Sequence, residues 1–496
     1  MPLIPLKLPA GVYKNGTDLE SSGRWRDSNL IRWEDGSLRP VGGWETRKAT
    51  AFASAPRGLI TWKDNSGNFH IAAGTHSHLY HLTADGTVAD ITPVGFNTGD
   101  VDAGENTGFG GSTYGTAFYG VKRPSDGAID FAATTWDLDT WGEYLVGCAD
   151  ADGKLYEWQL DHATPTVAAA VTNAPTGNLG MIVTEERFIM LLGANSNPRK
   201  VQWCDREDNT VWTATAENEA GDFELQTTGR IMGAVRVRGR VLLVTDTDAH
   251  TATYQGPPYV YGFEKVGDAC GAVSRKAMVA IDEGAFWMGA RSFYHFNGST
   301  ASVVNCDVSD FVFKNINRDQ ISKTYAVHNS QYGELWWFYP SGTGVENDSY
   351  VKLDYRDGTW DVGTIDRTAA VDLGVFDSPI WVDSAGNVYN HERIGYQHGA
   401  ETPFVESGPI SLGNGDQVMK VNKLIPDELN QGDVEVSFKT RFYPNGNESE
   451  YGPYTTANPT SVRFTGRQVR MRVEAINNAD FRVGVMRIEA RAGGRR

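Results

Sequence analysis

The chain has 496 residues, and its composition is that of a folded protein built from short strands. It is 40% hydrophobic and 22% charged, with 55 glycines, 14 tryptophans and 20 tyrosines. This mixture argues against intrinsic disorder and against long coiled coils, which are rich in Ala, Glu, Lys and Leu. At roughly 150 residues per domain, the length allows one large β-architecture with a smaller domain attached.

The formal net charge of −17 is distributed unevenly along the chain. Residues 401–496 contain 13 Lys+Arg and 12 Asp+Glu, so residues 1–400 carry −18. Proteins that grip duplex DNA neutralise its phosphates with a basic surface, and we therefore expect no sequence-specific DNA binding.

Other sequence features bear on the compartment. The four cysteines (Cys148, Cys204, Cys270 and Cys306) are far apart and include no C-x-x-C motif, which favours buried free thiols. No apolar run approaches the ~18 residues of a membrane-spanning helix. The first residues lack the basic and apolar regions of a secretion signal, so we expect the protein to be made in the cytoplasm.

A strand–turn–strand–turn–strand pattern recurs along residues 58–389. Comparable central strands are separated by 75, 44, 53, 45, 49 and 45 residues, and they are marked by Phe69, Tyr144, Phe188, Val241, Phe286, Leu335 and Ile380. Apart from the first, these steps match the ~40–50 residues of a four-stranded propeller blade. Residues 97–130 contain eight glycines and account for the long first step as an inserted loop or arm.

We therefore predict an all-β protein in which residues 47–400 form a β-propeller-like body of six or seven blades. A ring of blades has to close, because open edge strands pair with other chains. We expect residues 1–46 to close it, with the hairpin at 29–44 completing the blade formed by about 369–396.

Residues 401–496 are predicted to form a C-terminal β-sandwich domain. Alternation is clearest in residues 467–473, where Val469 and Met471 face one way and the neighbouring arginines face the other. The strand-like runs are 407–413, 434–439, 461–464, 468–473 and 481–486.

Two groups of residues are candidates for contacts between subunits. The first is the row of arginines formed by Arg463, Arg467, Arg470 and Arg472. It is either a solvated face or a subunit interface in which guanidinium groups pair with carboxylates or stack on aromatic rings. Glu448, Glu450 and Tyr451 in the preceding stretch are candidate partners, either within the domain or across subunits. The second group is Phe109 and Tyr114 in the glycine-rich arm.

The sequence contains no motif that selects a catalytic, cofactor or metal site. The turns at 150–153 and 383–386 resemble the Asp turns of sialidase-type propellers, but tight turns require Asp and Gly in any case. His76, His78 and His81 form the only histidine cluster, and a surface strand explains it better than a metal. We expect a protein that is not an enzyme.

Several runs together resemble the tail nozzle proteins of short-tailed bacteriophages, the tail tubular protein B-like or packaged-DNA-stabilisation group. Each run alone is weak, and their order and spacing over nearly the whole chain make the set specific. The runs are Gly11–Gly16, Gly23–Asp27, Leu38–Trp44, Trp136–Glu143, Ala220–Gly221, Gly256–Tyr259, Cys270–Gly271, Phe286–Gly289, Glu334–Ser341, Val405–Pro409 and Gly466–Val469.

The resemblance implies a virion protein of the tail, a homohexameric ring below the adaptor that joins the portal, with no catalytic residues. Its implied partners are further copies of itself, adaptor and portal-side tail proteins, and tail spikes, fibres or a plug. Genomic DNA would pass through the channel without specific binding, and acidic residues lining the channel would reduce adhesion to phosphate.

A different class of function is also compatible with a propeller. Propellers host glycan-binding and glycan-cleaving proteins, so the chain could be a tail component involved in host attachment. Its tryptophans would then stack on sugar rings, whereas the structural interpretation places them in the blade cores.

Overall fold

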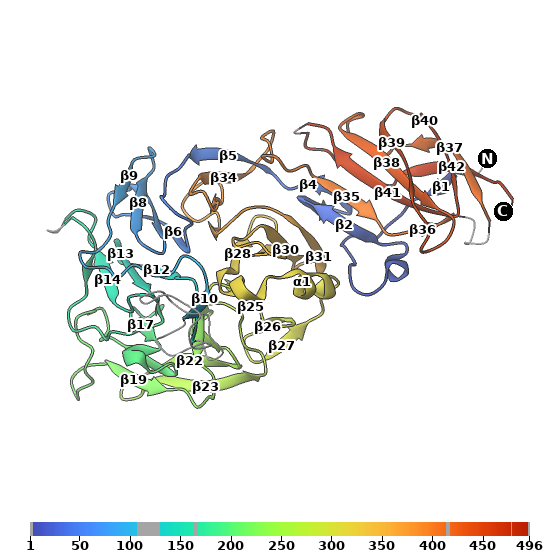
Figure 1. Ribbon diagram of the computed structural model, residues 1–496. Coiled ribbons are helices and arrows are strands. Elements are labelled where there is room, and N and C mark those ends of the chain that lie inside the picture. The colour runs from blue at the N-terminus through green and yellow to red at the C-terminus, as the bar shows by residue number, and fades with distance from the viewer. Residues whose placement is uncertain (1–2, 107–128, 163–165, 413–416, 478, 495–496) are drawn as a thin grey trace, which may run out of the picture.

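The structure is a computed structural model that describes residues 3–106, 129–162, 166–412, 417–477 and 479–494. Within these ranges, seven four-stranded antiparallel sheets form blades around one axis, and a β-sandwich lies beside them (Figure 1). The longest α-helix, α1, spans only Ser309–Asn315. No helix in the described part of the chain is long and apolar enough to cross a membrane.

Six blades are continuous in sequence, and the seventh takes its outermost strand from the N-terminal segment. The blades are β6–β9 (Gly58–Lys63, Phe69–Gly74, Leu79–Thr83, Val88–Asp90), β12–β15 (Trp136–Trp141, Tyr144–Ala149, Leu155–Trp158, Ala169–Ala170), β16–β19 (Gly180–Val183, Ile189–Leu192, Lys200–Trp203, Gly221–Glu224), β20–β23 (Ile231–Val237, Arg240–Thr245, Asp248–Gly256, Val260–Asp268), β24–β27 (Met278–Ile281, Gly284–Met288, Phe293–Phe296, Ala301–Val304), β28–β31 (Tyr325–Asn329, Glu334–Tyr339, Ser349–Asp354, Thr359–Thr364) and β32–β34 (Ala369–Val371, Ile380–Val382, Val388–Arg393) with β5 (Gly43–Lys48).

The first strands of the blades contact one another in the closed order β6, β12, β16, β20, β24, β28, β32 and back to β6. This ring order defines a β-propeller with seven blades, the upper of the two predicted numbers. All seven positions used to mark the repeat lie in or directly beside the second strand of a blade. The fully buried tryptophans fill blade cores, and they are Trp136, Trp287, Trp336, Trp337, Trp360 and Trp381.

The strand that closes the ring differs from the predicted one. β5 pairs with β34, so the N-terminal segment does complete the last blade. The hairpin predicted to do this instead forms a separate two-stranded sheet of β3 (Ile31–Glu34) and β4 (Ser37–Pro40). Charged side chains described below hold the hairpin between the two domains. The strand that follows it, β5, therefore pairs with β34 in the last blade.

The N-terminal segment also supplies one strand to each sheet of the sandwich, a role that the sequence did not indicate. β1 pairs with β42 and β2 pairs with β35. The first sheet has the order β1 (Leu3–Pro5), β42 (Arg487–Ala492), β37 (Met419–Ile425) and β40 (Thr460–Gly466). The second has the order β2 (Trp25–Asn29), β35 (Phe404–Ser407), β41 (Gln468–Ala475), β38 (Val434–Arg441) and β39 (Ser449–Thr455), with β36 (Ile410–Ser411) beside β41.

The predicted strand at 481–486 is wrong. This stretch is irregular, and Val483 forms isolated bridges with Leu38 and Glu428 instead of joining a sheet. Phe481, Val483 and Met486 are buried, and Val483 lies against Leu38 of the hairpin, so burial accounts for the apolar pattern without a strand. The four cysteines are buried and unpaired, as predicted.

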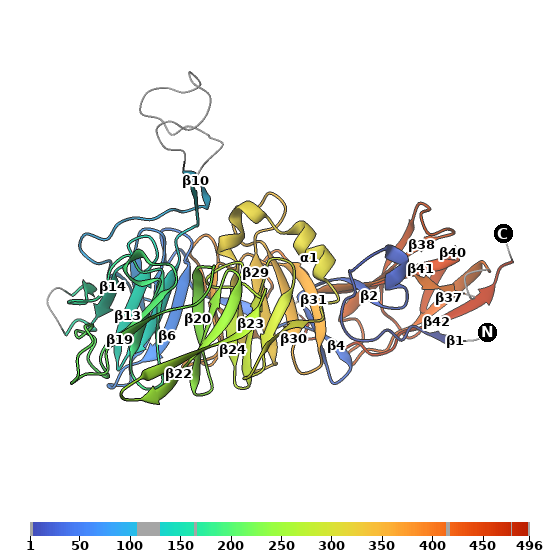
Figure 2. The ribbon, with the colours of Figure 1, turned by 90° about the horizontal axis from the view of Figure 1, so that it is seen from below.

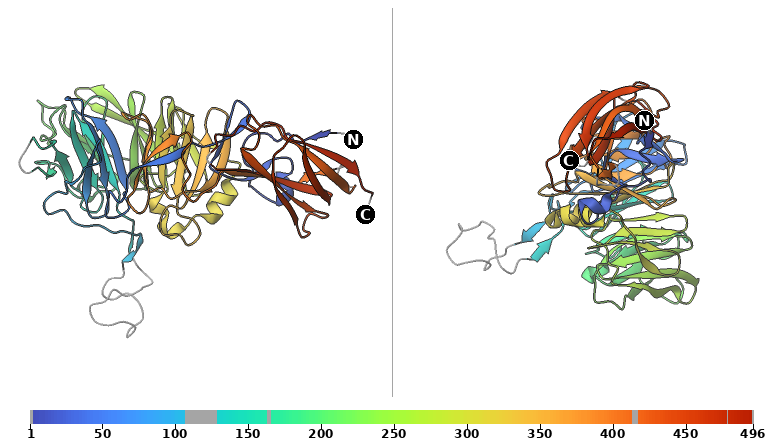
Figure 3. Two further views of the ribbon diagram at one scale, coloured as in Figure 1. Left: turned by 90° about the horizontal axis from the view of Figure 1, so that it is seen from above. Right: turned by 90° about the vertical axis from the view of Figure 1, so that its right-hand side faces the viewer.

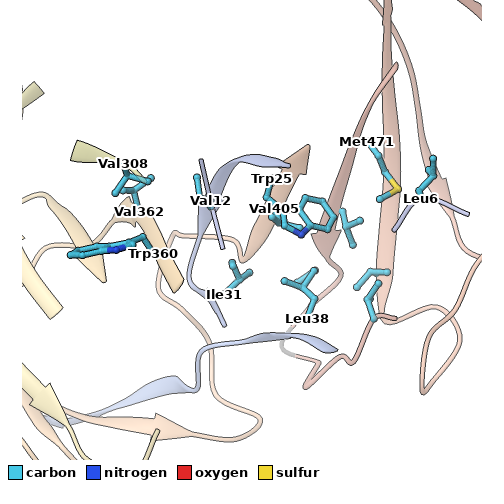
Figure 4. Packing of buried hydrophobic residues seen from close by; sticks show 14 of the residues in the cluster. Leu6, Val12, Trp25, Ile31, Leu38, Val308, Trp360, Val362, Val405 and Met471 are labelled. Atoms are coloured by element: carbon cyan, nitrogen blue, oxygen red, sulfur yellow. The ribbon is translucent and has the colours of Figure 1, made fainter. Parts of the chain in front are cut away.

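One continuous apolar core runs from the propeller into the sandwich through the N-terminal segment (Figure 4). Trp360 and Val308 lie on the propeller side, and Val405 and Met471 lie on the sandwich side. Between them are buried residues of the N-terminal segment, which are Val12, Trp25, Ile31 and Leu38.

Hydrogen bonds join β2 to β31, the outer strand of the sixth blade. Ser28 Oγ donates to the carbonyl of Val362 at 2.7 Å, and Thr364 N donates to Asn29 Oδ1 at 2.9 Å. The two domains are therefore joined by hydrogen bonds between side chains and main chain as well as by apolar contacts. The result is an elongated molecule with both termini at the sandwich end (Figure 3).

A cluster of buried charges centred on Arg32 holds the β3–β4 hairpin against the propeller. Arg32 donates to both carboxylate oxygens of Glu334 at 2.8 and 2.9 Å and to those of Glu392 at 2.6 and 2.8 Å. Lys352 Nζ lies 2.7 Å from Glu334 and 3.1 Å from Asp361. All five side chains are at most 5% exposed.

The cluster shifts the pKa values of two of its carboxyl groups in opposite directions. Burial favours the neutral form of Glu334, but the charges of Arg32 and Lys352 outweigh it and lower its pKa to about 2. Burial dominates at Asp361 and raises its pKa to about 7, despite the attraction of Lys352. Arg32 thus stabilises carboxylates that cannot be hydrated.

Replacing Arg32 by methionine should lower the free energy of unfolding by about 3–5 kcal/mol, because it leaves buried carboxylates without their partner. The matched control is Arg39→Met, since Arg39 lies directly opposite Arg32 in the hairpin. Its partners Glu34 and Asp480 are about one-third exposed, so a loss of about 1 kcal/mol or less is expected. Chemical denaturation measures both, and equal losses would contradict the role given to the cluster.

Candidate functional site

The central axis of the propeller is crossed by ion pairs between blades that are not neighbours. Lys276, just before β24 of the fifth blade, pairs with Asp137 in β12 of the second blade. Arg236 Nη1, in the fourth blade, lies 2.6 Å from Asp139 Oδ2, also in β12. Groups from non-adjacent blades meet only across the central space, so side chains occupy the axis.

The pKa shifts at the axis agree with charged, paired groups. Burial acts to lower the pKa of Lys276, but the charge of Asp137 outweighs it and the pKa is raised. Burial raises the pKa of Asp139, an effect opposed by Arg236 and by the amide of Val183, which donates to this carboxylate at 3.3 Å. The axis is therefore a polar structural core of the propeller.

One mouth of the axis is surrounded by acidic turns. In the described residues, the turns that join the first and second strands of the blades contain eight carboxylates and two arginines. The acidic residues are Asp64, Glu143, Glu185, Glu186, Asp282, Glu283, Asp372 and Asp377, and the basic ones are Arg187 and Arg238. These turns thus contribute a net −6 to the −18 of residues 1–400.

The opposite face carries the root of the predicted arm. β10 (Gly104–Asn106) and β11 (Ile129–Phe131) form a ribbon that stands off the same face as α1 (Figure 2). Lys323, which is fully buried, anchors the root through Asp102 at 2.6 Å and Glu346 at 3.0 Å. Phe109 and Tyr114, the predicted contact residues of the arm, lie outside the described residues.

The predicted row of arginines is divided between two sheets, which corrects the picture of a single arginine face. Arg463 is exposed on β40 in one sheet, while Arg470 and Arg472 lie on β41 in the other. Arg467 lies in the connection between the two strands, with its guanidinium 5.3 Å from the ring of Tyr443. Periodicity within a strand shows which residues share a face but not which sheet the strand joins.

The two arginines of β41 bind carboxylates of their own chain. Arg470 lies 2.5 Å from Asp18, in the 3-10 turn of the N-terminal segment, and 2.9 Å from Glu448. Arg472 Nε lies 2.7 Å from Glu474, and its guanidinium packs 3.5 Å from the ring of Phe404. Arg470 therefore ties the N-terminal segment to the sandwich, whereas the contacts of Arg472 lie within the sandwich.

The carboxylates of the two Asp turns have different roles. Asp383 accepts a hydrogen bond from the amide of Asn387 at 2.8 Å, which is the local interaction expected of a tight turn. Asp150 instead accepts one from the amide of Thr135 at 2.9 Å, which joins its turn to the residue before β12.

The histidine cluster does not come together. His76 and His78 lie in the turn between β7 and β8 rather than on a strand, while His81 is buried in β8, 2.8 Å from His70. In the part of the chain that the structure describes, no group of three or more His, Cys, Asp or Glu residues is arranged to hold a metal.

Comparisons with known proteins do not assign the chain to a family. No family model and no curated protein matches the chain. Among solved structures, it is similar to virginiamycin B lyase from Staphylococcus aureus (8% identity, 70% of this chain and 98% of that chain, TM-score 0.43) and to the Neurospora crassa Pan2 WD40 domain (8% identity, 72% and 96%, TM-score 0.38). At these values, the propeller assignment depends on the strand order and ring closure described above.

Reversing the charge of Arg470 should destabilise the isolated chain, because a glutamate there would face Asp18 and Glu448. We expect Arg470→Glu to cost about 1.5–3 kcal/mol, the range for losing hydrogen bonds to charged groups. Arg463→Glu, on an exposed site, should change stability by no more than about 0.5 kcal/mol. Thermal unfolding distinguishes the two, and an unaffected Arg470→Glu chain would contradict the intrachain role.

Proposed function

We propose that this chain is a structural subunit of the ring-shaped tail nozzle of a short-tailed bacteriophage. It would lie below the portal and adaptor and form the channel that retains and releases genomic DNA. The supporting observation is where the runs that carry the sequence resemblance fall in the fold. Leu38–Trp44 leads from the hairpin into β5, Val405–Pro409 includes all of β35 except its first residue, and Trp136–Glu143 contains β12. These runs therefore build the domain junction and the propeller axis.

The channel in this proposal runs between copies of the chain. Ion pairs cross the axis of each propeller, so DNA would pass along the axis of the assembled ring. A closed ring needs two different contact surfaces on every subunit, and a rigid two-domain body with an anchored ribbon supplies separate surfaces for this. The acidic turns would reduce adhesion to phosphate if they line the channel.

The proposed partners are five further copies of the chain, adaptor or portal-side proteins, and tail spikes, fibres or a plug. DNA would slide past without specific binding, and no enzymatic step is part of the proposal. The protein would be assembled in the host cytoplasm and function in the virion tail.

Electron microscopy of the purified chain, alone and with portal and adaptor proteins, tests the proposal. Rings of six copies around an open channel are expected. The variant Arg463→Glu should leave the chain folded. Its ability to form rings shows whether the exposed face of β40 lies in the contact between subunits. Particles that remain monomeric in the presence of both partners would contradict the nozzle assignment.

One feature favours the second candidate, a glycan-binding or glycan-cleaving tail component. The rings of Phe223 and Phe263 stack with centroids 4.3 Å apart and planes 3° apart, and Phe223 is 38% exposed. An exposed aromatic face of this kind can pack against a sugar ring. Tight binding of host polysaccharide by the monomer, lost in Phe223→Ala, would favour this function over the nozzle.

A further inference from the structure

A large cavity lies on the arm-side face of the propeller, where the first strands begin. Its volume is about 770 Å³, within the range of small-molecule pockets. Its walls come from segments far apart in sequence: the root of the β10–β11 ribbon, the starts of β12 and β20, the residues before β24, and the 3-10 helix Arg318–Lys323. The lining includes none of the ion-paired residues of the axis or of the acidic turns of the opposite face, although Thr135 and Arg275 lie within two residues of the axial pair Asp137–Lys276.

The lining combines apolar and polar groups. Met232, Val273, Ile321 and several alanines provide apolar surface, while Thr135, Ser274 and Ser322 provide hydroxyl groups. A wall of this mixed kind accommodates an organic molecule better than a bare ion.

The charged groups of the lining are three arginines and one aspartate, in a chain whose net charge is −17. Arg275 is held in place by Asp150 at 3.2 Å and by the carbonyl of Leu179 at 2.6 Å. Arg230 lies 3.7 Å from Asp246, and both side chains are substantially exposed. Neither of these carboxylates lines the cavity, so they orient guanidinium groups from behind.

Arg318 is the third arginine, and its side chain is exposed. Its Nη2 donates at 3.5 Å to the carbonyl of Phe313, a long hydrogen bond. Among the described residues it has no carboxylate within ion-pair distance, and the only acidic group of the lining is its neighbour, Asp319. Within the described part of the chain, this guanidinium therefore adds positive charge that no carboxylate pairs with.

We propose that this cavity binds a phosphate-bearing organic ligand of about the size of a nucleotide. A carboxylate is planar and is satisfied by one bidentate arginine, whereas the oxygens of a phosphate accept hydrogen bonds from several directions. Three guanidinium groups on three separate segments suit a phosphate, whose oxygens accept from several directions, better than a single carboxylate. The apolar wall accounts for an organic part, and the inference stands independently of the proposed nozzle function.

Titration calorimetry of the full chain at low salt tests the proposal with inorganic phosphate, thymidine monophosphate, a thymidine hexanucleotide and a glutamate tetrapeptide. The test variant is Arg230→Gln with Arg318→Gln. The control is Arg238→Gln, because Arg238 follows β20 at the end opposite Arg230 and is also exposed.

The monophosphate or the hexanucleotide should bind, and affinity should fall by about tenfold or more in the double variant, the factor expected for one lost charge-assisted hydrogen bond. The control should stay within about twofold. Tighter binding of the monophosphate points to a free nucleotide, and tighter binding of the hexanucleotide points to the end of a nucleic acid. No binding, an equal loss in the control, or equal or tighter binding of inorganic phosphate or of the peptide would overturn the proposal.

Discussion

The pairing of exposed strand edges is the constraint on which this structure depends, and residues 3–48 satisfy it in both domains. β5 closes the ring of blades, while β1 and β2 complete the two sheets of the sandwich. Open strand edges invite pairing with other chains. Residues 3–48 cover such edges in both domains at once, so the propeller and the sandwich are both completed by one segment. Arg32 and Arg39 lie opposite each other in the hairpin between these strands and reach toward the propeller and the sandwich, respectively.

This arrangement has consequences for any assembly of the chain. The two domains share an apolar core, and buried charges fix the hairpin between them to the propeller, so no flexible linker separates the domains. Ion pairs occupy the propeller axis, so in an assembly a large molecule would have to pass between subunits. The acidic turns and the anchored ribbon lie on opposite faces, so the propeller presents two chemically different surfaces.

The sequence predicted the propeller well, because each blade repeats an apolar second strand such as the one beginning at Phe69 or Leu335. It also predicted that the N-terminal segment closes the ring, though not through β5. Contacts between distant segments could not be predicted. Arg32 and Glu334 are 302 residues apart, and no local pattern connects them. The sequence could not show that Arg463 and Arg470 belong to different sheets for the same reason. Alternation within a strand shows which side chains share a face, but it does not show which strands pair with it.

Differential scanning calorimetry of the intact chain tests most directly whether the N-terminal segment makes one cooperative body of two domains. The shared core predicts a single transition whose calorimetric and van't Hoff enthalpies agree. Two well-separated transitions, one for the propeller and one for the sandwich, would contradict the account.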